Sequence, residues 1–352
     1  MARFLIRRIL LGLLVLWIVS MAVFFMFFKL NTSGPRAVAS RICGKQCSAE
    51  QINTVMQRLY LKEPLWRQYK YFLNGYPGKD DPNGLPVNHG VLPIHFAWPP
   101  SDMKVHAPDL GYSYVNQQSV NTILKDAFPV TMSLAAGAAV LWLFMGLASG
   151  IWSAIRPRSM LDRSFTFSAL FFYSMPTFVL GLMLILLLYY QLTIHGISWF
   201  PAQNYVPFTA SPGEWARHLL LPWFTLAAVT AAAYTRLTRG SMLDVLGEDY
   251  IRTARAKGLS ERRVVFRHGL RAALTPIVTQ FGIDLGTLLG GAIITETVFG
   301  LPGLGYSAVR AITSNDLPII IGVVVVATTA IVLANIFVDL MYAVLDPRVR
   351  LH

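Results

Sequence analysis

The sequence has 352 residues, of which 54% are hydrophobic and only 14% are charged, and its mean hydropathy is +0.50. Soluble domains average about 25% charged residues, so this composition excludes an ordinary water-soluble domain. The formal net charge is +12, which we interpret as a consequence of membrane topology and not as a sign of nucleic-acid binding.

Six apolar windows are each long enough to cross a hydrocarbon core of about 30 Å as a helix. Only the fifth carries a charged residue, Asp284. The windows do not alternate between apolar and polar residues, which excludes a β-barrel. Lipid offers the backbone no hydrogen-bond partner, so each window is predicted to be a helix. The predicted spans are residues 9–28, 130–155, 165–192, 219–235, 274–294 and 318–338.

The first window follows Arg3, Arg7 and Arg8, as the apolar part of a secretory signal would. Its apolar run is too long for a signal, and no A-x-A cleavage site follows it, so we predict a retained helix. With the N-terminus in the cytoplasm, more than half of the 30 Lys and Arg residues fall on the inner side. The two short outer loops carry only Arg217 and Arg310. The positive-inside rule therefore predicts both termini in the cytoplasm.

The predicted fold is an all-α polytopic membrane protein with six transmembrane helices. Residues 1–28 form the N-terminal end and first helix, 29–125 form a long extracytoplasmic segment, and 126–352 form a five-helix core. Within the core, a polar cytoplasmic loop over 236–273 joins the fourth and fifth helices.

The extracytoplasmic segment consists of two parts that differ in amino-acid composition. Its first part, 48–74, reads as helix that Ser48 caps and Pro64 breaks. Residues 75–108 are rich in Pro and Gly, which predicts an irregular loop. The loop histidines are interpreted as ordinary exposed residues, with a metal site as the alternative; they are His89, His95 and His106.

The two cysteines, Cys43 and Cys47, lie on the predicted exported side, where the compartment is oxidising. Their C-x3-C spacing favours a disulfide. Free thiols or a metal site are the alternatives, although two ligands alone make a poor zinc site.

The stretch 236–273 is too polar to span a membrane and too well patterned to be a linker. Helical sequence flanks AKGLS, where Gly258 can take the positive φ that ends a helix. Two short helices joined at a glycine, on the cytoplasmic side of a transmembrane helix bundle, form a protrusion that a soluble partner can bind. A basic surface that binds anionic lipid headgroups is the alternative.

The order of residues in this stretch resembles the coupling motif of binding-protein-dependent ABC permeases, in the branch that imports dipeptides, oligopeptides and nickel. That motif reads E-x-Y-x-R-T-A-R-A-K-G-L and is followed by H-x-L-R-x-A-x-x-P. The resemblance extends from the N-terminal helix to VDLMYAVLDPRVR near the C-terminus, while 75–108 and the two cysteines depart from it. The matching residues are Glu248, Tyr250, Arg252, Thr253, Ala254, Arg255, Ala256, Lys257, Gly258 and Leu259, then His268, Leu270, Arg271, Ala273 and Pro276.

The resemblance implies a B-type permease subunit in a bacterial plasma membrane. A second homologous permease would complete the path for peptides, an extracytoplasmic binding (lipo)protein would deliver them, and two cytoplasmic ATPase subunits would bind ATP and Mg. This chain has no G-x-x-x-x-G-K-[ST] motif and is expected to hold no catalytic residue, cofactor or metal. Nickel chelates, glutathione and oligosaccharides are alternative cargoes, and a secondary transporter or channel is the alternative of another class.

Site roles follow from the same resemblance. Ala254 and Ala256 are expected to let the coupling helix seat closely in an ATPase groove, and Arg252, Arg255 and Lys257 to meet acidic groups at its rim. Glycines on the fifth span predict packing between the two permeases, with pore lining as the alternative; they are Gly282, Gly286, Gly290 and Gly291.

Two further sets of residues are assigned roles. Burying Asp284 would cost about 2.5–3.5 kcal/mol, so it is expected to face water, a cationic substrate group or a partner in the heteromer. Glu296, Pro302 and Gly303 lie at the predicted outer mouth and are expected to form an outer gate.

Overall fold

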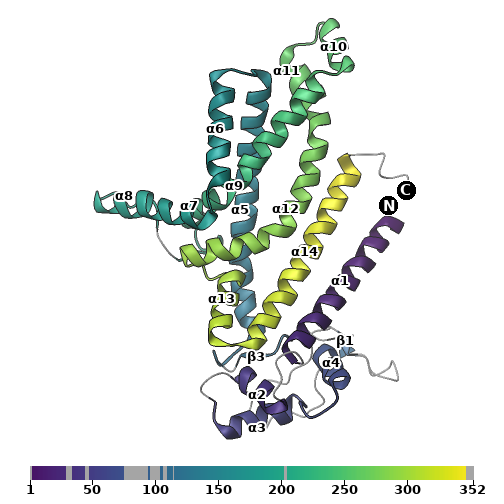
Figure 1. Cartoon of the computed structure of the whole chain (residues 1–352), viewed down its shortest axis with the longest axis vertical. Coiled ribbons are helices and arrows are strands. Elements are labelled where there is room, and N and C mark those ends of the chain that lie inside the picture. Colours follow the sequence, from purple (N-terminus) through teal and green to yellow (C-terminus); the bar gives the residue numbers. More distant parts are fainter. Residues whose placement is uncertain are drawn as a thin grey trace. The chain divides into compact units, whose positions relative to one another are not determined.

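The computed structural model describes residues 2–28, 34–43, 47–74, 94–95, 104–105, 109–113, 115–201 and 204–345. Helices dominate this part of the chain (Figure 1). Among these described residues, five helical segments are long and apolar enough to cross a membrane, or six if one bent pair counts as a single span. The predicted all-α polytopic fold is therefore confirmed.

Five of the six predicted windows lie within single long helices. Each of these helices extends beyond the apolar window. They are α1 (Ala2–Phe28), α5 (Val120–Ile155), α9 (Pro212–Leu246), α12 (Leu270–Phe299) and α14 (Leu317–Leu345).

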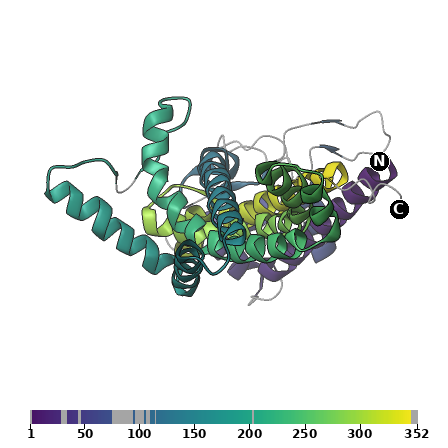
Figure 2. The same cartoon turned by 90° about the horizontal axis from the view of Figure 1, so that it is seen from above.

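The third window, predicted as one span over 165–192, is wrong as a single helix. It divides into α6 (Met160–Ser174), α7 (Thr177–Leu184), a π-helix (Ile185–Tyr190) and α8 (Gln191–Ile194). The break falls at Met175, whose ψ is 128°, because the residue before a proline is disfavoured in the helical region. Figures 1 and 2 show α7 and α8 extending away from the line of α6.

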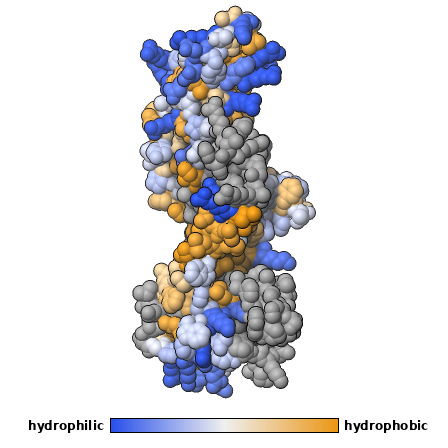
Figure 3. Space-filling view, turned by 90° about the vertical axis from the view of Figure 1, so that its right-hand side faces the viewer, coloured by the Kyte–Doolittle hydropathy of each residue, from blue (hydrophilic) through white to orange (hydrophobic). Residues whose placement is uncertain are grey.

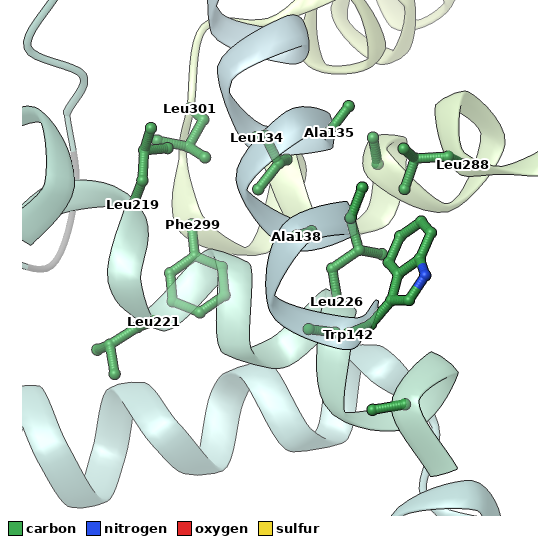
Figure 4. Close-up of a cluster of buried hydrophobic side chains, with 14 of the residues drawn as sticks. Leu134, Ala135, Ala138, Trp142, Leu219, Leu221, Leu226, Leu288, Phe299 and Leu301 are labelled. Atoms are coloured by element: carbon green, nitrogen blue, oxygen red, sulfur yellow. The ribbon is translucent and has the colours of Figure 1, made fainter. Parts of the chain in front are cut away.

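The chain forms two compact units. The first comprises Val130–Pro302 with Ile331–His352, and the second comprises Ala2–Pro129 with Gly303–Ala330. The core of the first unit lies where α5, α9 and α12 meet (Figure 4). Its largest fully buried side chains include Trp142, Tyr234 and Phe299.

Two glycines let α5 and α9 approach closely. A Cβ at Gly146 would lie 2.3 Å from the Cβ of Tyr234, and one at Gly150 would lie 2.5 Å from the Cβ of Thr238. Any larger side chain would push the helices apart. This G-x3-G pair is the kind of contact through which membrane helices associate, whereas such a contact was predicted only on the fifth span.

The second unit contains α1 and three shorter helices, α2 (Pro35–Cys43), α3 (Ala49–Arg58) and α4 (Leu65–Asn74). Ser48 caps α3 through a reciprocal pair of hydrogen bonds with Gln51, so the predicted capped helix is confirmed. The break falls earlier than predicted, because α3 ends at Arg58 and Pro64 directly precedes α4. Phe24 of α1 contacts the ring of Tyr69 at 5.2 Å between centroids.

The loop 75–108 is described only where β1 (Ile94–His95) pairs with β2 (Lys104–Val105). His89 and His106 lie outside the described residues. A second ladder pairs β3 (Tyr112–Ser113) with β4 (Gln118–Ser119). Cys47 is disulfide-bonded, while the side chain of Cys43 lies outside the described residues, so the Cys43–Cys47 pairing stays a prediction.

The second ladder is held by a buried carboxyl group just before α14. Ser113 donates a hydrogen bond to Asp316 Oδ2, and Asn116 Nδ2 donates to the same oxygen at 3.2 Å. Asp316 is fully buried, and this burial raises the pKa of its carboxyl above the usual range, against the lowering effect of the hydrogen bonds.

Candidate coupling site

The polar stretch 236–273 folds into a compact helical element. Helix α9 continues through Leu246, α10 spans Asp249–Ala256, and α11 (Glu261–Arg263) with a second π-helix (Val264–Gly269) leads into α12. Gly258 has a φ of +77°, so the predicted positive-φ turn after α10 is confirmed. Figure 3 shows hydrophilic side chains gathered at the end where α10 and α11 lie.

One face of α10 packs against the rest of the loop. Ile251, Ala254 and Val264 form a buried cluster, and Leu246 and Leu259 pack against it. Ala254 is only 8% exposed, so its small side chain serves close packing within the loop. The expectation that Ala254 lies on the outer face is corrected, because its spacing from Ile251 places both on the inner face.

The rest of the α10 surface is open, including Tyr250 at the edge of the buried face. Tyr250 is 46% exposed, and Thr253, Ala256 and Lys257 are exposed as well. Burial and, secondarily, the Glu248 carboxylate raise the pKa of the Tyr250 hydroxyl. That hydroxyl therefore remains protonated at neutral pH and can donate a hydrogen bond.

Two of the three expected rim cations already have partners inside the loop. Arg255 Nε lies 2.7 Å from Glu261 Oε1, and Arg252 Nη1 lies 3.4 Å from Asp249 Oδ1. Lys257 makes no ion pair with any described residue. The open face therefore presents an aromatic ring among largely matched charges, which favours recognition by shape over recognition by charge.

A second apolar cluster joins the loop to the helix bundle. Val265 of the π-helix packs with Met242 of α9, with Ile151 and Ala154 of α5, and with Ala273 of α12. Val264 and Val265 are neighbours in sequence but face different clusters. Contiguous apolar packing therefore joins α10 to three long helices.

A partly buried ion pair that the sequence did not indicate lies between α6 and α9. Arg239 of α9 makes two hydrogen bonds to Asp162 of α6, at 2.8 and 3.0 Å. These bonds, followed by one from Ser153, hold the pKa of Asp162 well below its usual range. Ser159 and Asp162 show the S-x-x-D spacing of a helix N-cap, which could have indicated Asp162. Nothing local indicates Arg239, because it lies 77 residues away.

Asp284 is half-buried on α12. Gln280 Nε2 donates to its Oδ1 at 3.0 Å, and the Tyr234 hydroxyl lies nearby. Asp284 thus has a donor within the chain, and the expectation that it also faces water, a substrate group or a partner stays a prediction. A Cβ at Gly282 would lie 2.5 Å from Val338 Cγ1, so this glycine allows packing between α12 and α14 of the same chain.

The other glycines of the fifth span lie on α12, and the structure does not describe what surrounds them. They are Gly286, Gly290 and Gly291. Of the outer-gate residues, Glu296 is fully buried and its Oε1 accepts a hydrogen bond of 2.6 Å from Thr131. Pro302 is exposed, and Gly303 is buried at the start of α13 (Leu304–Ser314).

Among the described residues, no group of three or more His, Cys, Asp and Glu side chains could hold a metal ion. Long apolar helices with a packed polar loop between two of them define a multi-pass membrane protein. The chain belongs to the binding-protein-dependent transport system inner membrane components, whose family profile matches residues 146–351. The profile of that family's N-terminal region matches residues 1–85. The chain is thus a permease component of an inner-membrane transport system.

Curated relatives cover most of the chain. The dipeptide transport system permease protein DppB of Escherichia coli K12 is 34% identical over 86% of each chain. The glutathione transport system permease protein GsiC of Escherichia coli O6:H1 is 35% identical over 99% of each chain. The oligopeptide transport system permease protein AppB of Bacillus subtilis 168 is 38% identical over 69% of this chain and 76% of its own length.

A solved structure shares part of the fold. The inward-facing MetNI methionine ABC transporter contains a chain that matches with a TM-score of 0.50 and 19% identity, over 64% of this chain and 97% of its own.

Proposed function

We propose that this chain is one of two permease subunits in an ATP-binding-cassette importer of peptides in a bacterial plasma membrane. The relatives named above support a peptide cargo, because dipeptides, oligopeptides and glutathione all contain peptide bonds. A second homologous permease would complete the path, and an extracytoplasmic binding (lipo)protein would deliver the peptide. Two cytoplasmic ATPase subunits would bind ATP and Mg, since this sequence has no phosphate-binding loop.

The observation that carries the proposal is the form of the 236–273 loop. Its inner side is buried against the bundle, and its outer side presents a half-exposed tyrosine on a short helix. Protein interfaces typically centre on aromatic anchors that fill a pocket on the partner. We assign the docking of the ATPase to this outer face, with Tyr250 as its anchor, Gly258 setting the turn, and Lys257 as the one rim cation with no ion pair among the described residues.

In this mechanism, ATP binding draws the two ATPase subunits together, and each carries a coupling helix with it. The displacement of α10 reaches α9 and the π-helix through the Ile251 cluster, and then α5 and α12 through the Val265 cluster. The two permeases would then change between inward-open and outward-open states as rigid bodies. ATP drives the change only because the ATPases bind the two states with different free energies.

The remaining assignments complete the proposal. Both termini and the coupling loop lie in the cytoplasm, and residues 29–125 lie outside. Gly286, Gly290 and Gly291 line the contact with the second permease, with a pore-lining position as the alternative. Glu296, Pro302 and Gly303 belong to the outer gate.

The test is reconstitution of the permease with its companion subunits, comparing Tyr250→Ala with Trp199→Ala. Both residues are exposed aromatics, at 46% and 71%, but Trp199 lies in the loop after α8. Loss of an anchor costs about 2 kcal/mol or more, so Tyr250→Ala should weaken ATPase binding roughly 30-fold. Trp199→Ala should bind ATPase normally. Equal binding by both variants would refute the docking assignment, and failure of dipeptides, oligopeptides and glutathione alike to stimulate ATP hydrolysis would refute the cargo.

A further inference from the structure

Asp162 has four hydrogen-bond donors around one buried carboxylate. Arg239 Nε donates to Oδ1 at 2.8 Å, Arg239 Nη2 donates to Oδ2 at 3.0 Å, and the backbone amide of Arg158 donates to Oδ2 at 2.8 Å. The Ser153 hydroxyl donates to Oδ1. Asp162 is only 4% exposed.

These donors come from three different elements. Ser153 lies in the last turn of α5, Arg158 lies in the turn between α5 and α6, and Arg239 lies on α9. The turn itself is tightly specified, because Arg158 has a φ of +65° and Ser159 caps α6 by accepting from the Asp162 amide. A single carboxylate thus fixes the start of α6 to both of its neighbours.

The position of Arg239 connects this carboxylate to the coupling loop. Helix α9 is continuous from Arg239 to Leu246, a distance of about two turns. Leu246 packs against the cluster that contains Ile251 of α10. A continuous helix is stiff over this length, so a displacement of α10 reaches the Arg239 backbone directly.

The hydrophobic effect is non-directional, so apolar contacts between α6 and α9 specify no particular orientation by themselves. A guanidinium that makes two hydrogen bonds to one carboxylate fixes both distance and orientation. The two exposed ion pairs of the loop, Arg255–Glu261 and Arg252–Asp249, lack this burial.

We propose that Asp162 and Arg239 are positioning residues that make the α5–α6 turn move with the coupling loop, so that the displacement of α10 drives α6 as well as α9. The inference depends on the coupling role assigned above. It adds that α6 belongs to the part of the permease that moves with α10, although neither end of α6 is joined directly to a helix of the coupling loop.

The test compares Arg239→Gln with Arg236→Gln. Arg236 lies on the same helix, is exposed, and has no hydrogen bond or ion pair with the described residues, so the charge change is matched. In reconstituted complexes, Arg239→Gln should assemble but transport at least tenfold fewer peptides per ATP hydrolysed, while Arg236→Gln should match the wild type. Arg239→Lys should be intermediate, because it keeps the charge but loses the paired hydrogen bonds. Asp162→Asn combined with Arg239→Gln should be no worse than Arg239→Gln alone.

A second measurement applies even where Arg239→Gln fails to assemble. Spin labels at Pro157, in the α5–α6 turn, and Thr253, on α10, should keep one separation in the nucleotide-free and ATP-bound complexes. A change in that separation would overturn the inference, as would equal transport per ATP by Arg239→Gln and Arg236→Gln. Either result leaves the proposed function standing if Tyr250→Ala still releases the ATPase, so the two failures are distinguishable.

Discussion

Replacement of Gly258 by valine tests whether the turn after α10 transmits force. The φ of Gly258 is +77°, and a Cβ built there would meet no atom within 4 Å. Steric clash with neighbours is therefore absent, and the whole cost is backbone strain, roughly 1–3 kcal/mol for a non-glycine residue in this region. The chain can avoid that strain only by giving up the hydrogen bonds that close α10.

Those closing bonds are Gly258 N to Arg255 O at 2.9 Å and Leu259 N to Ala254 O at 3.4 Å. Each backbone bond contributes about 0.5–1.5 kcal/mol net, so either route disturbs the turn by a similar amount. Coupling free energies between protein sites are typically about 1–3 kcal/mol. The substitution therefore perturbs the turn by as much as the entire coupling, while the apolar spans stay intact.

We expect Gly258→Val to insert and assemble normally, to lose peptide transport by tenfold or more, and to lose stimulation of ATP hydrolysis by the loaded binding protein. Gly258→Asn is the matched rescue, because asparagine tolerates positive φ and should transport nearly as wild type. Gly213→Val is the control for the added side chain, since its Cβ also meets open space but its φ is not in the left-handed region. The assay is uptake and ATP hydrolysis in proteoliposomes.

Wild-type transport by Gly258→Val would refute the coupling role of the turn. An equal loss in Gly258→Asn would show that the position needs the absence of a side chain and not the backbone angle. In that case the reasoning from strain is wrong, and contact of the ATPase with the glycine itself explains the loss.

The other predictions concern the extracytoplasmic side and its connection to the membrane. A cysteine introduced at position 90 should react with an impermeant reagent in intact cells and one at position 260 should not; the reverse pattern would overturn the orientation. Cys43 and Cys47 should gain two thiols by intact mass only after reduction, and thiols in the native protein would contradict the disulfide. Asp316 has a raised pKa in the folded state, so its contribution to stability is fully present below its ordinary pKa of about 3.9 and is lost as pH rises through the raised value. Thermal unfolding in detergent should therefore show Asp316→Asn gaining stability relative to wild type as pH rises; an unchanged difference across pH would contradict this.

Several features could be predicted from sequence because their causes are local. The spans follow from composition, since a run of about 20 apolar residues in lipid can only be helical. Ser48 capped its helix and Gly258 adopted positive φ, each through the chemistry of one or two residues. The break at Met175 was also local, and Pro176 signalled it, but the length of the apolar run outweighed that signal.

Only the tertiary structure decided which side chains meet. Ala254 faces inward because Val264 lies against it, Glu296 is buried because Thr131 on another helix donates to it, and Asp162 finds Arg239 across 77 residues. A membrane sequence gives little guidance here, since apolar residues face lipid and protein alike and hydropathy does not separate the two faces of a helix. Which helices pack together depends on the fit of small residues, such as Gly150 against Thr238. It also depends on buried polar groups that need hydrogen-bond donors from elsewhere in the chain. Those requirements are satisfied jointly by helices that are distant in sequence, so they become visible only when the helices are packed.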